Sequence, residues 1–135
     1  MRVFIDSNLL IYLNALKSPE LRARYESFYL DLLSDNKAYT DVLVLDELIY
    51  ISKRKYNVPY NISLEFLESI VLPYVEILPL GKREFDKASE LLKSLNIKPS
   101  DALHAATMIL NGISKIASED KEFDKVKGVE RIWIS

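Results

Sequence analysis

The sequence predicts a single α/β domain, a three-layer α/β/α sandwich in outline, with a central, mostly parallel sheet of four or five strands. Short apolar runs that suit buried strands alternate along the chain with longer amphipathic segments that suit helices, and this alternation is typical of βαβ units. At 135 residues the chain is long enough for one domain with a real core and too short for two. We therefore expect one domain over residues 1–135.

Charge and cysteine content limit the kind of site. A formal net charge of −2 does not indicate a nucleic-acid partner. It does not exclude one either, because acidic residues gathered in one pocket can mask a basic rim elsewhere. The absence of cysteine excludes disulfides and thiolate metal sites. The sequence shows no charged leader and no long apolar segment, so we expect a cytoplasmic protein without a membrane partner.

The first strand is predicted by the apolar run Val3-Phe4-Ile5, which fits a short strand buried on both faces at the centre of the sheet. Asp6 follows directly, at the strand end where ligands bind in open α/β sheets. Aspartate is also a favoured helix cap, so a purely capping role is the alternative for Asp6. We expect Ser7 or Asn8 to cap a short helix that begins at Leu9.

The middle of the chain is predicted to form three helices and two strands, from hydrophobic spacing and capping residues. Ser18 and Pro19 mark the start of the first helix, and Asp41 is placed to cap the second. The second helix ends on Lys53-Arg54-Lys55, which suits its dipole; contact with RNA is the alternative. These elements are a helix over residues 19–34, a weak strand over 37–40, helices over 42–55 and 62–71, and a strand over 75–78.

The last third is predicted to contain two helices and two strands, over residues 82–95, 102–111, 113–118 and 129–134. The second helix is small or apolar nearly all round, so we expect it to be buried against the sheet, with Gly112 just past its end. His104 on this helix is expected to be packed and hydrogen-bonded, with a metal or proton-transfer role as the alternative. Residues 119–127 are expected to form a loop with at most one helical turn.

Acidic residues recur near the ends of the predicted strands. Asp6 ends the first strand, and Asp46-Glu47 lies about two turns into the helix after the second. Asp101 begins the buried helix, and Glu119-Asp120 follows the fourth strand. Carboxylates gathered at one sheet edge raise one another's pKa and destabilise the fold unless a cation compensates. Oxygen ligands with one histidine and no cysteine favour Mg²⁺ or Mn²⁺ over zinc.

Four blocks of the sequence resemble, in order and spacing, the signature blocks of PIN-domain ribonucleases, most closely VapC-type toxins. They are Val3-Phe4-Ile5-Asp6-Ser7-Asn8, Leu45-Asp46-Glu47-Leu48, Pro99-Ser100-Asp101-Ala102-Leu103-His104-Ala105-Ala106 and Ser118-Glu119-Asp120-Lys121-Glu122-Phe123-Asp124. The resemblance covers essentially the whole chain. It implies a catalytic, metal-binding quartet made of Asp6, Glu47, Asp101 and Asp120, holding Mg²⁺ or Mn²⁺.

The family pattern also selects between neighbouring acids. It prefers Glu47 to Asp46, and Asp120 to Glu119, with Asp124 as a possible auxiliary residue. Asn8 and Ser118 become polar neighbours of the quartet, and Ser118 stands where the family more often has threonine. For Asp101 the alternative is a first-turn acid that merely favours the helix dipole.

The function implied by the resemblance is that of a metal-dependent endoribonuclease, the toxin of a type II toxin–antitoxin pair. The alternatives within the family are a non-toxin RNA-processing nuclease and a catalytically inactive PIN-like binding module. Phosphotransfer receivers need an acidic pair after the first strand, and haloacid dehalogenase-type phosphatases need Asp-x-Asp there. Asp6 is followed by Ser7 and Asn8, so both classes fit less well.

The resemblance also implies three partners: the RNA substrate, a cognate antitoxin whose basic tail enters the acidic cleft, and a second copy of the chain. The helices over residues 19–34 and 42–51 carry many large side chains, and apolar surface left outside the core marks an interface. The side chains expected there are those of Tyr25, Phe28, Tyr29, Leu45, Ile49 and Tyr50. One or two tyrosines are also candidates for stacking on an RNA base.

Overall fold

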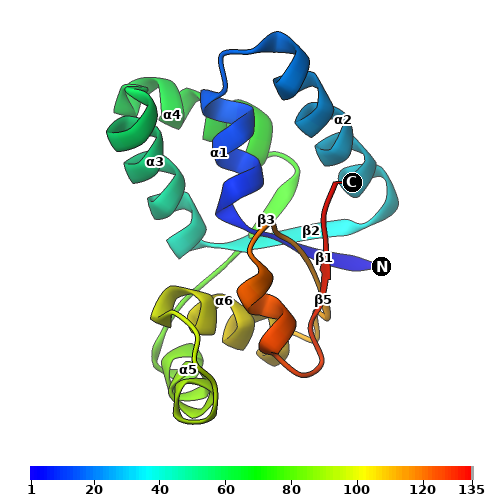
Figure 1. Ribbon diagram of the computed structural model, residues 1–135, viewed down its shortest axis with the longest axis vertical. Helices are drawn as coiled ribbons and strands as arrows, with labels where there is room; N and C mark the ends of the chain where they lie inside the picture. The colour runs from blue at the N-terminus through cyan, green and yellow to red at the C-terminus, as the bar shows by residue number, and fades with distance from the viewer. Residues whose placement is uncertain (135) are drawn as a thin grey trace.

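The computed structural model describes residues 1–134, and this part of the chain contains a five-stranded parallel sheet (Figure 1). The strands lie in the order β3-β2-β1-β4-β5, and each neighbouring pair is parallel. The prediction of a mostly parallel sheet of four or five strands is confirmed. The strands are β1 (Arg2–Ile5), β2 (Lys37–Asp41), β3 (Val75–Leu78), β4 (Lys115–Ala117) and β5 (Glu130–Ile132).

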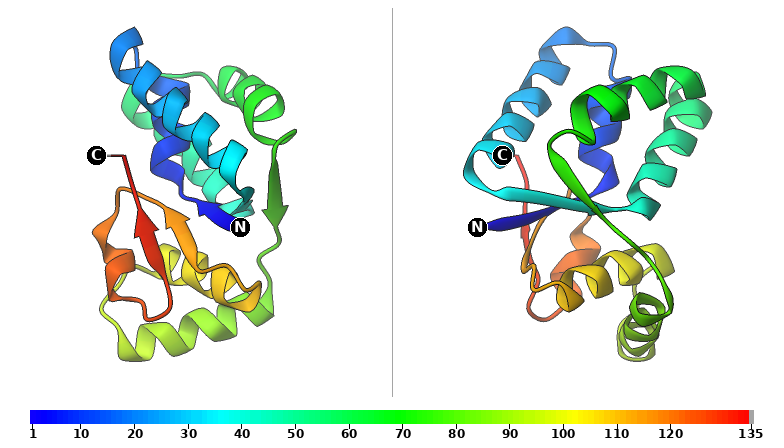
Figure 2. Two further views of the ribbon diagram at one scale, coloured as in Figure 1. Left: turned by 90° about the vertical axis from the view of Figure 1, so that its right-hand side faces the viewer. Right: turned by 180° about the vertical axis from the view of Figure 1, so that it is seen from behind.

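Helices cover both faces of the sheet, so the predicted three-layer α/β/α arrangement is confirmed (Figures 1 and 2). One layer contains α1 (Ser7–Ala15), α2 (Pro19–Asp35), α3 (Val42–Tyr56), α4 (Tyr60–Phe66) and the π-helical turn η1 (Leu67–Val71). The other layer contains α5 (Lys82–Ser94), α6 (Pro99–Leu110) and the 3-10 turn η2 (Lys121–Lys125). None of the helices in residues 1–134 is both long and apolar enough to cross a membrane.

Capping residues explain where the helices begin. The Asp41 carboxylate accepts a hydrogen bond from the Val44 N–H at 3.0 Å, so the predicted cap of α3 is confirmed. At α1 the prediction is wrong: the Asp6 carboxylate accepts from the Ser7 N–H at 2.8 Å, and the helix begins at Ser7 rather than at Leu9. Asp6 is therefore a helix cap as well as the residue that ends the first strand.

Four further element boundaries differ from the predicted ones by two residues or more. α6 begins at Pro99 instead of residue 102, because the Ala102 N–H already bonds to the Lys98 carbonyl, and Asp101 therefore lies in the first turn. α4 begins at Tyr60, two residues early, since the Pro59 carbonyl accepts from the N–H groups of residues 62 and 63. β4 begins at Lys115, because the Ile113 N–H is still bonded to the Met108 carbonyl at the end of α6. β5 is limited to three residues. Gly112 has φ of 67° just past α6, as predicted for a residue that ends a helix.

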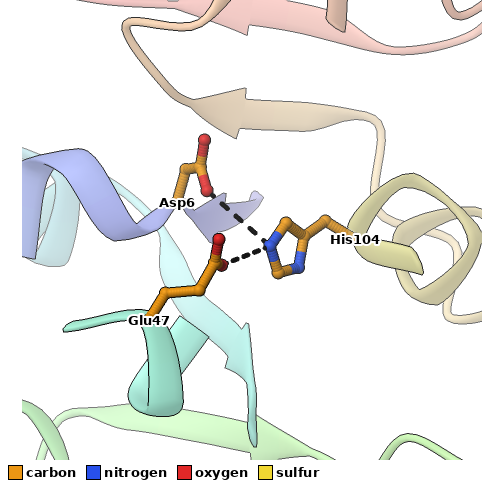
Figure 3. A group of neighbouring side chains, drawn as sticks. All are labelled: Asp6, Glu47 and His104. Atoms are coloured by element: carbon orange, nitrogen blue, oxygen red, sulfur yellow. Dashed lines mark hydrogen bonds and ion pairs between the residues drawn. The ribbon is translucent and has the colours of Figure 1, made fainter. Parts of the chain in front are cut away.

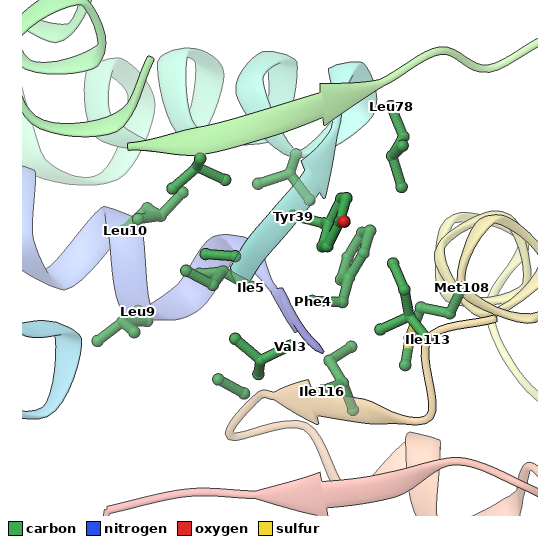
Figure 4. Close-up of a cluster of buried hydrophobic side chains, with 14 of the residues drawn as sticks. Val3, Phe4, Ile5, Leu9, Leu10, Tyr39, Leu78, Met108, Ile113 and Ile116 are labelled. Atoms are coloured by element: carbon green, nitrogen blue, oxygen red, sulfur yellow. The ribbon is translucent and has the colours of Figure 1, made fainter. Parts of the chain in front are cut away.

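The core is built around β1. Val3, Phe4 and Ile5 are fully buried, as predicted for a strand covered on both faces. Figure 4 shows them between side chains of both helical layers, including Leu9 of α1 and Met108 of α6. Full burial of an aliphatic or aromatic side chain contributes about 1.5–3 kcal/mol. The backbone that carries Asp6 is therefore held by the most deeply buried strand.

Most of the apolar side chains expected on the outside of α2 and α3 are covered. Tyr29 is buried, and Tyr25, Phe28, Leu45 and Ile49 are partly buried against the core; Tyr50 is exposed. Of these six side chains only Tyr50 is exposed, but Leu21 and Leu30 of α2 and Val42 of α3 are exposed as well, so the expectation of apolar surface outside the core is confirmed in part. Tyr25 and Phe28 are covered because the C-terminal segment after β5 returns to this layer, where the Trp133 ring lies 5.9 Å from the Tyr25 ring and 5.6 Å from the Phe28 ring.

Candidate active site

Three strand ends bring buried polar side chains to the carboxyl edge of the sheet. Asp6 follows β1, Asp41 ends β2 and Ser118 follows β4, and all three are buried. The Ser118 hydroxyl donates to Asp6 Oδ2 at 2.6 Å and accepts from the Asp120 N–H at 3.0 Å. With the Ser7 N–H on its other oxygen, the Asp6 carboxylate is hydrogen-bonded on both sides. The prediction that Ser118 is a polar neighbour of Asp6 is confirmed.

His104 enters this edge from α6 and joins carboxylates of two other elements. Its Nδ1 lies 2.7 Å from Asp41 Oδ2, and its Nε2 lies 2.8 Å from Glu47 Oε1. Nε2 is also 4.0 Å from Asp6 Oδ1, an ion pair that Figure 3 marks with a dashed line. The ring has no exposed surface. The prediction of a packed, hydrogen-bonded histidine is confirmed.

All four acids of the predicted quartet line one cavity of about 400 Å³, although they come from four separate elements. Asn8 lines it too, and its side-chain oxygen accepts from the Glu119 N–H at 3.3 Å. Asp124 does not line the cavity, and its carboxylate instead pairs with Arg131 at 3.0 Å. The structure thus brings the quartet and Asn8 together and places the auxiliary candidate Asp124 elsewhere.

The crowded acids resist ionisation. Burial raises the pKa of Asp6, although the His104 charge and the hydrogen bonds from Ser118 and Ser7 oppose the shift. Burial, followed by the charges of Asp120 and Asp6, raises the pKa of Asp101 to about 7. Within residues 1–134, Asp101 Oδ2 is buried without a hydrogen-bond partner. The site therefore carries more negative charge than the surrounding residues satisfy.

The His104 ring supplies positive charge inside this cluster. Burial acts to lower the pKa of His104, but hydrogen bonds to Asp41 and Glu47 outweigh it and raise the pKa to about 10. The ring is therefore an imidazolium at neutral pH. One buried cation faces several carboxylates, which leaves room for a further positive charge.

The donor set fits a hard cation. One ligand atom each from Asp6, Glu47 and His104 can be chosen so that all lie within 4.8 Å of one another. Both His104 nitrogens already face carboxylates, so the available donors are carboxylate oxygens. The unpartnered oxygen of Asp101 adds a further buried donor. This acidic cluster could hold a metal ion.

Sequence reasoning missed Asp41 and Lys98 as parts of the site. Asp41 was expected only as a helix cap, yet its second oxygen holds His104. Its position was a usable signal, because Asp41 directly follows the predicted strand over residues 37–40, as Asp6 follows the first predicted strand. Lys98 lines the cavity from the residue before α6, and Lys55 lines it from the end of α3. For Lys55 this placement favours the alternative of contact with a ligand over a merely solvated helix end.

Comparison with known proteins gives a consistent family. The model of the PIN domain family matches residues 3–129. Ribonuclease VapC13 of Mycobacterium tuberculosis is 26% identical over 135 residues, covering 96% of this chain and 98% of the relative. Ribonuclease VapC2 of Methanocaldococcus jannaschii is 28% identical over 149 residues, covering 98% of this chain and 94% of the relative.

Solved structures share the fold at lower sequence identity. VapBC2 from Rickettsia felis, bound to a promoter DNA fragment, matches with a TM-score of 0.73 and 21% identity, covering 98% of both chains. VapC20 of Mycobacterium tuberculosis, described as a Sarcin-Ricin loop cleaving toxin, matches with a TM-score of 0.73 and 16% identity, covering 90% of this chain and 92% of that one. The family model spans nearly the whole chain, so the chain belongs to the PIN domain family.

Proposed function

We propose that this chain is a metal-dependent endoribonuclease that hydrolyses RNA phosphodiester bonds. The observation that carries the proposal is the convergence of four carboxylates, from Asp6, Glu47, Asp101 and Asp120, on one cavity at the carboxyl edge of the sheet. Membership of the PIN family and resemblance to relatives named as ribonucleases support it.

The cation proposed for this cavity is Mg²⁺ or Mn²⁺, because both prefer carboxylate oxygens. When bound, such an ion supplies an acidified water nucleophile and positive charge for the phosphate oxygens. Asp6, Glu47 and Asp101 are the proposed principal ligands. Asp120, whose N–H is held by Ser118, is proposed to hold a second ion or to orient the attacking water.

RNA has to approach an acidic cavity, so positive charge is needed beside the carboxylates. Lys55 and Lys98 line the same cavity from α3 and from the start of α6, and both are exposed. We propose that they contact phosphates on either side of the scissile bond. Tyr12 and Tyr56 also line the cavity, and we propose that one of them stacks on a base.

The biological role that we propose is that of the toxin in a type II toxin–antitoxin pair, acting in the cytoplasm. Structures with this fold include a toxin–antitoxin complex from Klebsiella pneumoniae, similar with a TM-score of 0.68. An antitoxin would restrain this chain by placing a basic residue against Asp6, Asp101 or Asp120, and arginine suits this best because it pairs bidentately with carboxylate. A homodimer is proposed as well.

The proposal is tested by incubating purified protein with end-labelled RNA in Mg²⁺, Mn²⁺ or excess chelator. We expect cleavage only with the ions, and none by an Asp6→Asn, Asp101→Asn double variant. Asp124→Asn is the matched control, because Asp124 is an exposed acid outside the cavity. RNA cleavage by the double variant at the wild-type rate would overturn the proposal.

A further inference from the structure

We infer that His104 is a positioning residue, which holds the Glu47 carboxylate at the cavity through a buried chain of hydrogen bonds, Asp41–His104–Glu47, and is not itself a metal ligand. The inference rests on the proposed function, since Glu47 is one of the proposed ligands. It concerns a histidine and an aspartate that lie behind the cavity rather than in its lining.

The chain is anchored at its buried end. Asp41 is fully buried at the end of β2, and its two oxygens have separate partners. Oδ1 accepts from the Val44 N–H in the first turn of α3, and Oδ2 lies 2.7 Å from His104 Nδ1. The carboxylate cannot rotate without losing the helix cap. The His104 ring, itself without exposed surface, is therefore fixed in orientation.

The ring has no free nitrogen for a metal. An ionised carboxylate only accepts hydrogen bonds, so a nitrogen 2.7–2.8 Å from one must donate a proton. Because Nδ1 of His104 lies 2.7 Å from Asp41 and Nε2 lies 2.8 Å from Glu47, each ring nitrogen already has a carboxylate partner. Coordination through either nitrogen would break one of these two bonds. His104 Nε2 lies 4.0 Å from Asp6 Oδ1. We interpret this distance as an ion pair between the two side chains, not as two ligand atoms that share one metal ion.

His104 acts by fixing the position of the Glu47 carboxylate. The Glu47 side chain leaves α3 on several rotatable bonds and is about 29% exposed, so without a partner it would sample many rotamers. The bond from Nε2 fixes Oε1 and leaves Oε2 as the oxygen available to a cation. Partners that orient a ligand in this way commonly change metal affinity or activity by about 10–100-fold when they are removed.

The first test uses the fact that His104 is the only histidine in the sequence. Protein labelled with ¹⁵N-histidine gives one ring spectrum. At pH 7.5 we expect two ring N–H protons, protected from solvent exchange, with and without Mg²⁺. A ring with a single N–H, or a ring that loses one N–H when Mg²⁺ is added, would overturn the inference.

The second test is a double-mutant cycle read by Mn²⁺ affinity in calorimetry. His104→Gln removes a positive charge, which by itself would strengthen Mn²⁺ binding; positioning predicts a weakening of about 10–100-fold instead. In the Glu47→Ala background the same substitution should cause no weakening, because His104 acts through Glu47. Equal weakening in both backgrounds would show that His104 is a ligand and would overturn the inference.

Two further variants keep the test decisive. Asp41→Asn keeps an oxygen for the α3 cap, and we expect the His104 ring to lose its Nδ1 proton and keep Nε2–H toward Glu47. Thr107→Val is the matched control, a buried polar residue on the same helix whose hydroxyl bonds to the Leu103 carbonyl; it should leave Mn²⁺ affinity unchanged. Neither test needs RNA, so wild-type protein that fails to cut RNA would overturn the proposed function and leave this inference to be decided separately.

Discussion

The two sides of the cavity differ in how their carboxylates are satisfied. On one side, Asp6 is bonded by the Ser7 N–H and the Ser118 hydroxyl, and Glu47 is held by His104. On the other side, Asp101 has an oxygen without a partner within residues 1–134, and its pKa is raised to about 7. The protein itself satisfies the carboxylates of the first side, whereas the second side has a buried carboxylate oxygen that the proposed cation could satisfy.

The largest expected effect comes from removing a charge on the first side. Asp6→Asn keeps an oxygen to cap α1, so the fold should survive, while RNA cleavage with Mn²⁺ should fall by at least about 10²-fold, because a metal ligand contributes several kcal/mol of charge stabilisation. Single-turnover cleavage measures this, with the melting temperature as the control for folding. Wild-type rates from the purified variant would remove Asp6 from the site.

The second-largest expected effect is a difference in the free energy of unfolding between variants on the two sides of the cavity. Ser118→Ala leaves Asp6 Oδ2 and the Asp120 N–H without the hydroxyl, and each lost partner in a buried place costs about 1–3 kcal/mol. We expect metal-free Ser118→Ala to unfold at lower urea concentration than wild type. Asp101→Asn should unfold at the same or higher concentration. Destabilisation of both variants to the same extent would show that the two sides do not differ.

The dependence of stability on pH tests the second side directly. Unfolded aspartate has a pKa of about 3.9, so the raised pKa of Asp101 contributes stability below about pH 4, and this is lost as the pH rises through about 7. Metal-free wild-type protein should lose about 1 kcal/mol more than Asp101→Asn between pH 6 and pH 8. The contribution of His104 to the free energy of unfolding also falls over this pH range, but it falls in both proteins.

Adding Mg²⁺ at pH 8 should restore the lost free energy of unfolding of the wild-type protein. The same addition should stabilise Asp101→Asn much less, and urea titrations of both proteins measure the difference. Parallel pH profiles of the two proteins without metal would contradict the unsatisfied state of Asp101.

The smallest expected effect concerns the two lysines at the rim of the cavity, Lys55 and Lys98. Lys55→Ala and Lys98→Ala should each weaken binding of a single-stranded RNA a few-fold at about 0.1 M salt and reduce the slope of log affinity against log salt by about 0.7. Fluorescence anisotropy with Asp6→Asn as the parent protein measures this without cleavage. Lys93→Ala, an exposed lysine of α5, is the control. An unchanged slope in both rim variants would mean that RNA approaches from elsewhere.

Much of the fold was predictable because its signals are local. The buried strand Val3-Phe4-Ile5, the cap at Asp41 and the glycine after α6 depend on neighbours within a few residues. The cover over Tyr25 and Phe28 was not predictable, because Trp133 lies more than a hundred residues away in the sequence. The π-helical turn Leu67–Val71 has the same apolar spacing as an ordinary helix, so no pattern distinguishes it.

The residues of the site were also predictable only where their signals are local. Placement of acids after strands indicated Asp6 and the pair Glu119-Asp120, and the family resemblance selected Glu47 and Asp120 over their neighbours. The partners of His104 were hidden, since Asp41 and Glu47 lie 63 and 57 residues from it. A histidine on an apolar helix indicates burial and a hydrogen bond but does not say with which residue. The site role of Asp41 was missed because one of its oxygens has a sufficient local explanation.

The central place of β1 has a consequence for behaviour on heating. β1 pairs with β2 and β4, and its last three residues are fully buried, so its amide protons should exchange with solvent only through global unfolding. Glu47 and Asp101, in contrast, are carried by helices of opposite layers. Partial opening of either layer moves one of them away while Asp6 stays in place. Thermal inactivation should therefore precede the melting of the sheet.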